Sequence, residues 1–368
     1  MVTGAVLLII AGCAAYQYFK GNIVRGVATV FMMLIASFIA FGYFEYMAKF
    51  LVGFEALESL GVWVYVICFA LLFLISFALF QTGIIAIMRE PIDLGNWAEK
   101  IGRPIAGVFL GWILSGVILV ICALAPLPNT YPYSRFDERN PKADQRTKAF
   151  LNADGMVSGW FSMISKGSFS AISKPQSFAV IRASFLDQLY LNRHAIGQGI
   201  SVLTKEVAIS VPAKVAVWRA PDGLVDQDDK SFSGQGGSQP MIVRISLKKK
   251  GLSEHSPFTM GQVRIVCKSV SQGDVDLQGQ GVVIYPSGYM TGANSVLIRS
   301  LKDKITVSSE AFRKDQSSRP IDFVCLVPNG FVPVLAEFKM NNAAMIPPAV
   351  TGENIPAIEP LKIKPKAE

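Results

Sequence analysis

Long runs of apolar residues fill the first 127 residues of the chain, and the remaining 241 residues contain no comparable run. A helix rises about 1.5 Å per residue, so about 20 apolar residues cross the hydrocarbon layer of a bilayer. Four runs come close to that length or exceed it, and none carries a charged residue near its middle. The pattern predicts a multi-pass membrane domain of four transmembrane helices over residues 2–19, 27–44, 62–88 and 105–127.

The first run has an alternative interpretation. Ile10, Ala11, Gly12 and Cys13 resemble the cleavage box of a bacterial lipoprotein, in which Cys13 would be lipidated. A signal peptide needs a positively charged segment before its apolar run, and residues 1–4 carry no such charge. The apolar run also continues past the cysteine, which favours a retained helix and leaves lipidation as the alternative.

The basic residues of the short loops predict the orientation, because cytoplasmic loops carry an excess of Lys and Arg. The first and third loops hold five of them, and the second loop holds only Lys49, near two glutamates. We therefore expect the first and third loops in the cytoplasm, with both termini and the large C-terminal region extracytoplasmic. The five residues that set this topology are Lys20, Arg25, Arg89, Lys100 and Arg103.

Beyond the membrane domain the spacing of apolar residues changes twice. Residues 128–198 begin with a polar, charged linker and continue with short amphipathic helices, one carrying Phe178, Ile181, Phe185 and Leu189 on a single face. Arg182, Asp187 and Arg193 fall on the opposite side of that helix.

From about residue 200 the apolar residues alternate with polar ones, as in strands. Seven or eight short strands separated by turn residues predict a mostly-β domain, a β-sandwich, over residues 199–341. Residues 342–368 hold five prolines among few large apolar groups and are expected to be a disordered tail. The clearest strands are 207–211, 241–245, 281–285 and 296–299, with others starting at Val263, Ile305, Ile321 and Val332.

The net charge lies entirely in the C-terminal region. Residues 1–127 hold six basic and six acidic residues, so the net charge of +8 belongs to residues 128–368, where 248–250 are three consecutive lysines. Such a surface suits an anionic envelope component, and the alternative is that the charge serves solubility alone. Aromatic residues are not interleaved with the basic ones, so nucleic acid is not an expected partner.

Two of the five cysteines lie on predicted strands. Cys13, Cys68 and Cys122 fall inside the spans, whereas Cys267 and Cys325 point to the core faces of their strands. In an oxidising compartment these two could form a disulfide, and the alternative is two independent buried thiols.

The residues that catalysis requires are sparse. The chain has two histidines, His194 and His255, and neither has the spacing of a zinc ligand or of a base beside a nucleophile. The aspartates of residues 222–229 do not fit a calcium loop, because Lys230 takes a ligand position and no glutamate closes the loop. No enzymatic activity, cofactor or metal is expected.

The spans also offer few groups for coupled transport. Gln81 and Thr82 lie late in the third span, and Glu45 and Lys49 form an i,i+4 pair at the end of the second. The fourth span carries Gly107, Gly111 and Ser115 along one face, which allows another helix to approach closely. That neighbour lies either within the same chain or in a second protomer.

The first 127 residues resemble the colicin V production (CvpA) family of bacterial inner-membrane proteins. The likeness rests on the four-span layout, on Lys20-Gly21 through Arg25-Gly26, and on the glycines 102, 107 and 111. Ser115-Gly116 stands where the family has an Arg-Gly pair. The resemblance implies a part in toxin production or export and in envelope maintenance, without enzymatic activity.

Three functional hypotheses follow. The first is a non-enzymatic inner-membrane protein that forms homo-oligomers or joins a membrane-protein partner and presents its outer domain for binding. The second is a component of a secretion or transport complex whose helices form part of a path. The third, which the missing catalytic residues disfavour, is an enzyme tethered to the envelope.

Overall fold

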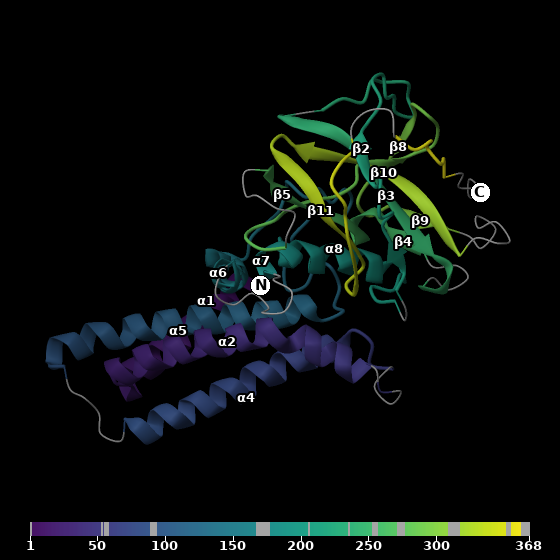
Figure 1. Ribbon diagram of the computed structural model, residues 1–368. Coiled ribbons are helices and arrows are strands. Elements are labelled where there is room, and N and C mark those ends of the chain that lie inside the picture. The colour runs from purple at the N-terminus through teal and green to yellow at the C-terminus, as the bar shows by residue number, and fades with distance from the viewer. Residues whose placement is uncertain are drawn as a thin grey trace. The chain divides into compact units, whose positions relative to one another are not determined.

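A computed structural model of the chain forms two compact units. The helical unit comprises Met1–Arg135 and Thr147–Met163, and the β unit comprises Phe136–Arg146 and Ile164–Glu368 (Figure 1). The structure describes residues 2–52, 54, 59–88, 94–166, 177–204, 207–234, 236–251, 257–270, 277–307, 317–350 and 355–361.

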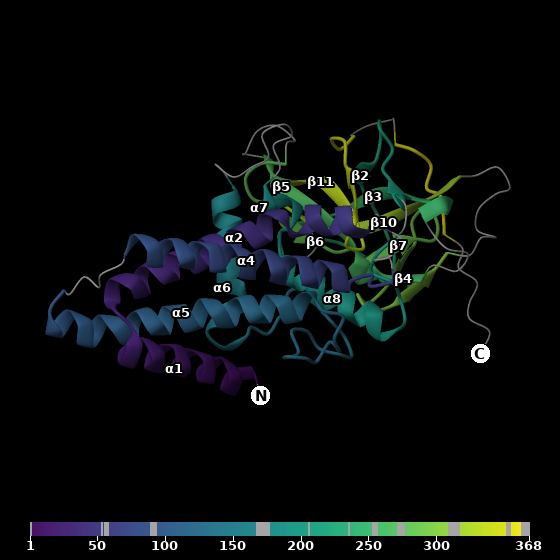
Figure 2. The same ribbon diagram turned by 90° about the horizontal axis from the view of Figure 1, so that it is seen from below.

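Four helices in the helical unit are long and apolar enough to cross a membrane, as the sequence predicts. Long apolar runs without an internal charge favour unbroken helices. In a helix every backbone N–H and C=O away from the ends is hydrogen-bonded, so no backbone polar group is left unpaired in lipid. They are α1 (Val2–Lys20), α2 (Ile23–Val52), α4 (Trp63–Ile87) and α5 (Asn96–Leu124), shown from a second side in Figure 2.

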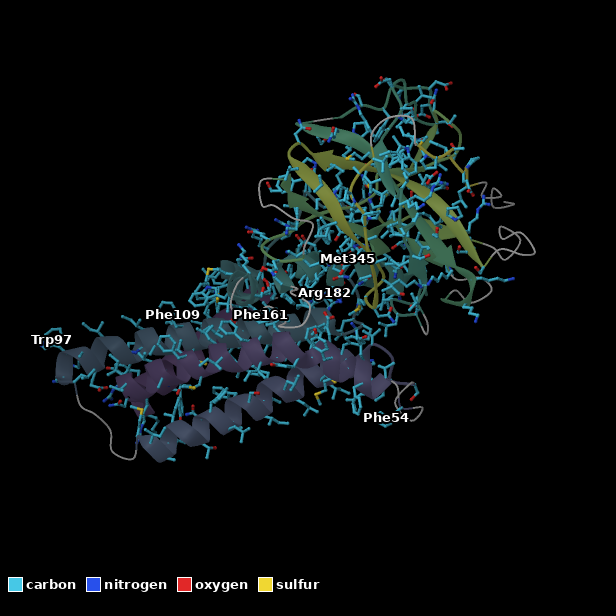
Figure 3. The ribbon with its side chains drawn as sticks, in the orientation of Figure 1. Phe54, Trp97, Phe109, Phe161, Arg182 and Met345 are labelled. Atoms are coloured by element: carbon cyan, nitrogen blue, oxygen red, sulfur yellow. The ribbon has the colours of Figure 1, made fainter. Side chains whose placement is uncertain are left out.

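The helices pack α1 on α5, and α2 on both α4 and α5. Large apolar side chains stay exposed on the outward faces, which is the expected surface of a lipid-facing bundle. Trp97 and Phe109 of α5 (Figure 3) are 80% and 47% exposed.

The predicted start of the fourth span is wrong by nine residues, because α5 begins at Asn96 rather than at residue 105. Lys100 and Arg103 therefore belong to the helix and not to a loop. The additional two turns are polar, but Glu99 and Arg103 form an i,i+4 ion pair that favours helix there.

The β unit begins with two short helices, α7 (Phe178–Ile181) and α8 (Phe185–Gly197). The sequence suggested one continuous helix here, but α7 ends at Ile181, and Ser184, with a left-handed φ of 53°, is the N-cap of α8. Asp187 and Arg193 were expected on a polar side opposite the apolar face, yet they are only 3% and 2% exposed. Their burial requires partners, and Asp187 accepts a hydrogen bond from Arg146.

Antiparallel sheets make up the rest of the β unit. The central pair is β3 (Ser238–Lys248) and β10 (Ser318–Pro328), which are in register over their full length. The larger sheet has the order β1-β3-β10-β7-β8 with β2 also on β3, the second is β12-β11-β5-β6, and β4 pairs with β9. The remaining strands are β1 (Ile209–Ser210), β2 (Val217–Arg219), β4 (Pro257–Thr259), β5 (Val263–Ser269), β6 (Val282–Ile284), β7 (Gly288–Met290), β8 (Val296–Ile298), β9 (Lys304–Thr306), β11 (Phe331–Phe338) and β12 (Asn342–Met345).

Each predicted strand is present, and the main core joins one face of β3 and β10 to one face of β5 and β11. The opposite faces are buried too. Ile242 and Val324 pack with Trp218 in a second cluster, and Val266 and Val334 pack with Val180 of α7 in a third. Alternation in a strand predicts a buried face and an open face, but here both faces are covered.

The prediction of a disordered tail is wrong for the described residues 342–350 and 355–361. Asn342–Met345 forms β12 on β11, and Val350 N–H donates to Val217. Leu361 is 3% exposed, and Ile358 packs against the cluster around Trp218. Prolines are compatible with such a segment because an extended chain lying on a sheet face does not use every backbone N–H.

Candidate functional site

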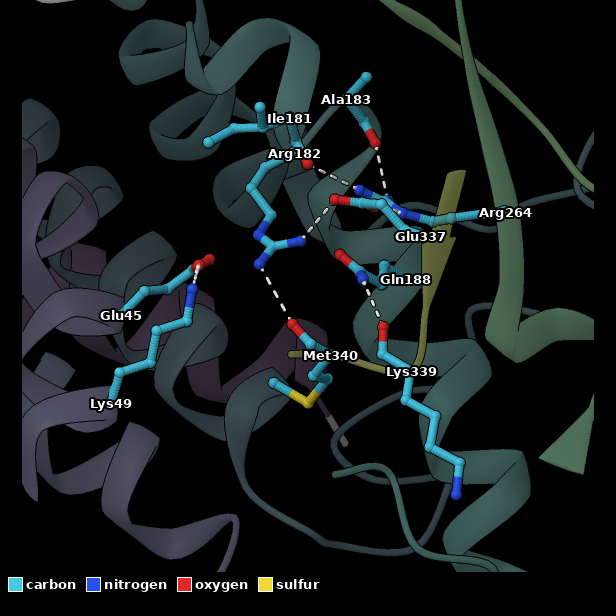
Figure 4. A network of polar contacts seen from close by, with 10 residues as sticks. All are labelled: Glu45, Lys49, Ile181, Arg182, Ala183, Gln188, Arg264, Glu337, Lys339 and Met340. Atoms are coloured by element: carbon cyan, nitrogen blue, oxygen red, sulfur yellow. Dashed lines mark hydrogen bonds and ion pairs between the residues drawn. The ribbon is translucent and has the colours of Figure 1, made fainter. Parts of the chain in front are cut away.

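A network of buried charges in the β unit surrounds Glu337 of β11 (Figure 4). Arg264 of β5 is its register partner, and the guanidinium Nε donates to Glu337 Oε2. Arg182, which follows α7, donates from Nη1 to Glu337 Oε1 at 2.9 Å. Arg264 and Glu337 are 1% and 2% exposed, so each charge depends on the other for compensation.

Further donors of both arginines bind backbone carbonyl oxygens. Arg264 donates to Ile181 at 3.0 Å and to Ala183 at 3.1 Å, and Arg182 donates to Met340 at 3.2 Å. These carbonyls belong to the end of α7, to the turn before α8, and to the turn after β11. The network therefore fastens the short helices to the sheet, and its charged groups are engaged in structural contacts.

A second buried ion pair lies on the larger sheet. Arg244 of β3 and Asp322 of β10 are register partners and form two hydrogen bonds of 2.6 and 2.7 Å. The guanidinium carbon lies 5.1 Å from the ring centroid of Trp218, which adds a cation–π contact. The tail covers the pair, because Ala357 O accepts from Arg244 and Glu359 N–H donates to Asp322.

Burial lowers the pKa of two basic side chains of the β unit, Lys339 and His194. Burial lowers the pKa of Lys339 to about 8. Burial also lowers the pKa of His194, with an opposing effect from Glu138 and a further lowering by Lys302. No group of three or more His, Cys, Asp or Glu that could hold a metal occurs within the described ranges.

Cys267 and Cys325 both point into the main core, as predicted, and both are free thiols. Burial raises the pKa of Cys267 to about 12. The pKa of Cys325 is raised by burial and also by its neighbour Cys267. Thiols in this state are poor nucleophiles, because the thiolate is the reactive form.

The helical unit has its own polar cluster, at the end where α1 meets α2. Glu99 of α5 is 6% exposed and accepts from Asn22 Nδ2 at 3.0 Å and from the Ile23 N–H at 3.2 Å. Arg103 Nε also donates to Glu99, at 2.5 Å. Because Ile23 begins α2, the carboxylate lies at the positive end of a helix dipole.

Arg25 and Thr29 extend this cluster toward α4. Arg25 donates to Met88 O, the carbonyl at the end of α4, where a cation is favoured by the helix dipole. Thr29 donates to Gln81 Oε1 at 3.3 Å. Two of the residues predicted to set topology therefore contact helix ends. Arg25 binds the end of α4 directly, and Arg103 binds Glu99, which caps the start of α2.

The other residues predicted to set topology contribute no buried contact among the described residues. Lys20 and Lys100 are exposed, and Arg89 lies outside the described residues. The expected pair of Glu45 and Lys49 on α2 is present at 4.0 Å (Figure 4).

The small-residue face of α5 meets α1 of the same chain. A Cβ added at Gly107 would lie 2.6 Å from Ala14 Cα, and one added at Gly111 would lie 2.6 Å from Ile10 Cα. Ser115 is fully buried and donates to Trp112 O at 2.9 Å. Of the two neighbours left open by the sequence, the structure has the intramolecular one at this face.

Sequence reasoning missed Glu99, Glu337 and Asp322. Glu99 could have been found, because an i,i+4 pair with Arg103 directly before an apolar run indicates that the helix starts earlier. Glu337 and Asp322 alternate with apolar residues in their strands and therefore looked solvent-facing.

Three comparisons with known proteins give no match for this chain. No protein-family model matches it, no curated protein is similar to it in sequence, and no solved structure matches it. The buried polar groups of both units hold segments of the chain together, so the architecture is the feature that bears on function.

Proposed function

We propose that the chain is a non-enzymatic, CvpA-like protein of a bacterial inner membrane that presents its β unit outside the cytoplasm to bind an envelope partner. One observation carries this proposal: the apolar helices and the antiparallel sheets are separate compact units, each with its own core. An anchor joined to a folded, basic domain suits recognition at a membrane surface better than chemistry within it.

The buried charges support a binding role over catalysis. Arg182, Arg264 and Arg244 all bind carboxylates together with backbone carbonyls, so they hold segments in place. An active site instead requires groups with hydrogen-bonding capacity left for a substrate.

The orientation and the partner are parts of the same proposal. The excess of Lys and Arg in the first and third loops favours an extracytoplasmic β unit, whose two larger sheets we interpret as a β-sandwich. Its basic surface suits an anionic envelope component, and the helical unit would form a homo-oligomer or bind a membrane-protein partner. Since α1 occupies the glycine face of α5, that assembly would use a different helix face.

Reporter fusions test the orientation. A reporter that is active only outside the cytoplasm, fused after residue 368, is expected to be active, and one active only inside is expected to be silent. The opposite result would refute the extracytoplasmic assignment. Crosslinking of the intact protein in cells, followed by purification, should then recover an envelope component that is lost when the basic residues 248–250 are replaced.

A component of a secretion or transport complex is the second candidate, because ionisable residues are buried within the helical unit. Glu99 is 6% exposed, and Asp154 is fully buried with Arg135 3.9 Å away. Ionisable residues buried within a membrane domain commonly mark solute or proton paths. Solute or proton flux through vesicles containing the full chain, abolished by Glu99→Gln, would favour this candidate over the first.

A further inference from the structure

After α5 ends at Leu124, the chain returns to the side of the helical bundle. A short 3-10 turn (Phe150–Asn152) leads into α6 (Ala153–Ser165), which belongs to the helical unit as far as Met163. The sequence predicted a linker that leaves the membrane, followed by short amphipathic helices, and did not predict that one of these helices packs on the bundle.

The contacts show how far along the spans α6 packs. The ring of Phe161 stacks on Phe41 of α2 with centroids 5.3 Å apart and an interplanar angle of 16°. On α5, a Cβ added at Gly116 would lie 2.3 Å from Ala153 O, so a glycine is required for this approach. Trp112 Nε1 donates to Leu151 O at 3.3 Å.

These contacts lie well inside the ends of the spans. Gly116 precedes the end of α5 by eight residues, which corresponds to about 12 Å along the helix. Phe41 precedes the end of α2 by eleven residues, or about 16 Å.

The neighbouring helix α4 gives a second measure of depth. Phe69 of α4 contacts Phe41 with centroids 5.0 Å apart, so the two residues lie at the same level. Phe69 follows the first residue of α4, Trp63, by six residues, or about 9 Å. Since α4 is apolar over its 25 residues, about 37 Å, a hydrocarbon layer of about 30 Å centred on it would include the level of Phe69.

The polarity of α6 is the reverse of that of a helix on a water-soluble protein. Its charged residue points inward: Asp154 is 0% exposed and accepts a hydrogen bond from Tyr133, and Arg135 donates to the same tyrosine at 3.0 Å. Its outward side carries Trp160 and Met163, which are 46% and 58% exposed. Leu151, just before α6, is 55% exposed.

We propose that α6 and the preceding turn form a re-entrant segment in the leaflet where α2 and α5 end, with Leu151, Trp160 and Met163 in contact with lipid acyl chains. Two observations assign this face to lipid: its exposed side chains are apolar, as they are on the spans, and its buried acid is paired internally. Irregular backbone at this depth is tolerated because protein covers its polar groups. This inference rests on the membrane assignment of the helical unit.

The test uses the full chain in phospholipid vesicles and the fluorescence of Trp160. A variant that keeps Trp160 and replaces the other four tryptophans by Phe is measured with lipids brominated near the headgroup end of the acyl chain, and with aqueous iodide. We expect loss of emission with the brominated lipid and little loss with iodide. Quenching by iodide alone would overturn the proposal, and so would the absence of quenching by either agent.

Two matched variants distinguish a failure of the re-entrant segment from a failure of the membrane assignment. A variant that keeps only Trp63, 44% exposed at the start of α4, should be quenched by brominated lipid. If it is not, the membrane assignment itself fails. A variant that keeps only Trp218, 1% exposed in the β unit, should respond to neither agent.

A second measurement avoids multiple substitutions. Trp160→Phe in the otherwise unchanged protein should remove a component of the emission that brominated lipid quenches. If the lost component is insensitive to brominated lipid, the segment does not contact acyl chains.

Discussion

The two units accommodate buried charge in different ways. In the spans of the helical unit the buried and half-buried charged side chains lie near helix ends: Glu99 binds the first N–H of α2, and Arg25 binds the Met88 carbonyl at the end of α4. In the β unit the charges lie on strand faces and pair across strands, as Arg264 with Glu337 and Arg244 with Asp322.

The difference follows from where each kind of structure leaves its backbone unpaired. A helix has free N–H groups at its start and free carbonyls at its end, so a single charge there is compensated by the backbone itself. The inner strands of a sheet have no free backbone groups, so a charge buried on a sheet face needs a side chain of opposite charge. Removing one partner should therefore cost more in the β unit than in the helical unit.

The largest effect is expected for Glu337→Leu. The change leaves Arg264 and Arg182 buried without a carboxylate, and breaking a buried pair in this way costs about 3–5 kcal/mol. The free energy of unfolding of the full chain in detergent, followed by Trp fluorescence in urea, gives the measurement. Asp228→Ala is the control, because its pair with Lys230 is exposed and is worth about 0–1 kcal/mol. Equal effects of the two changes would contradict the structural role of the network.

Gly111→Ala should have the next largest effect. The new methyl group meets the backbone of α1, and forcing extra atoms into a packed contact costs about 1–3 kcal/mol. Gly83→Ala, where no atom lies within 4 Å, is the matched control and should leave stability unchanged or raise it. Helix content measured by circular dichroism during denaturation in SDS tests both. If Gly111→Ala is as stable as Gly83→Ala, the close approach of α1 to α5 is wrong.

Glu99→Gln should cost less, about 0.5–2 kcal/mol, because the amide still accepts from the start of α2 while the interaction with the helix dipole is lost. Arg103 is partly exposed and contributes less through its own pair. The same SDS denaturation, repeated with Arg103→Gln and with both changes together, should show non-additive losses. Additive losses would mean that the two side chains do not interact.

The last effect concerns Lys339 and depends on pH. Its pKa is lowered to about 8 from a usual 10.5, so between these values the unfolded chain binds more protons than the folded chain. Stability should therefore rise from about pH 8 to 10.5, because the unfavourable burial of the charge is relieved.

The stability of Lys339→Met, measured by thermal unfolding across that pH range, should not show the part of the rise that comes from Lys339. Lys249→Met, at an exposed position, serves as the control and should behave like the unchanged protein. A Lys339→Met variant with the full pH dependence would show that another group is responsible.

The four spans and the strands of the β unit follow from local patterns, because apolar length and alternation depend on neighbouring residues alone. Glu337 shows that local patterns do not predict whether a charged residue on a strand is buried. It occupies an outward position on its strand, and its burial is decided by α7 and α8, which cover that face from more than 140 residues earlier in the chain.

The order of the described tail and the position of α6 could not be predicted from local patterns for the same reason. Residues 355–361 look unstructured by composition, yet Arg244 and Asp322 bind their backbone. The polar segment after α5 looks like a linker, yet Tyr133 and Arg135 bind Asp154 and bring α6 to the bundle.

The sequence by itself determined the four apolar helices, the alternating strands, and the concentration of positive charge in residues 128–368. Only the tertiary structure decided which charges are buried, which helix meets the glycine face of α5, and where residues 147–163 lie. The physical reason is that hydrophobic length and period act locally. The cost of burying a charge or a backbone group is instead met by partners far away in the chain.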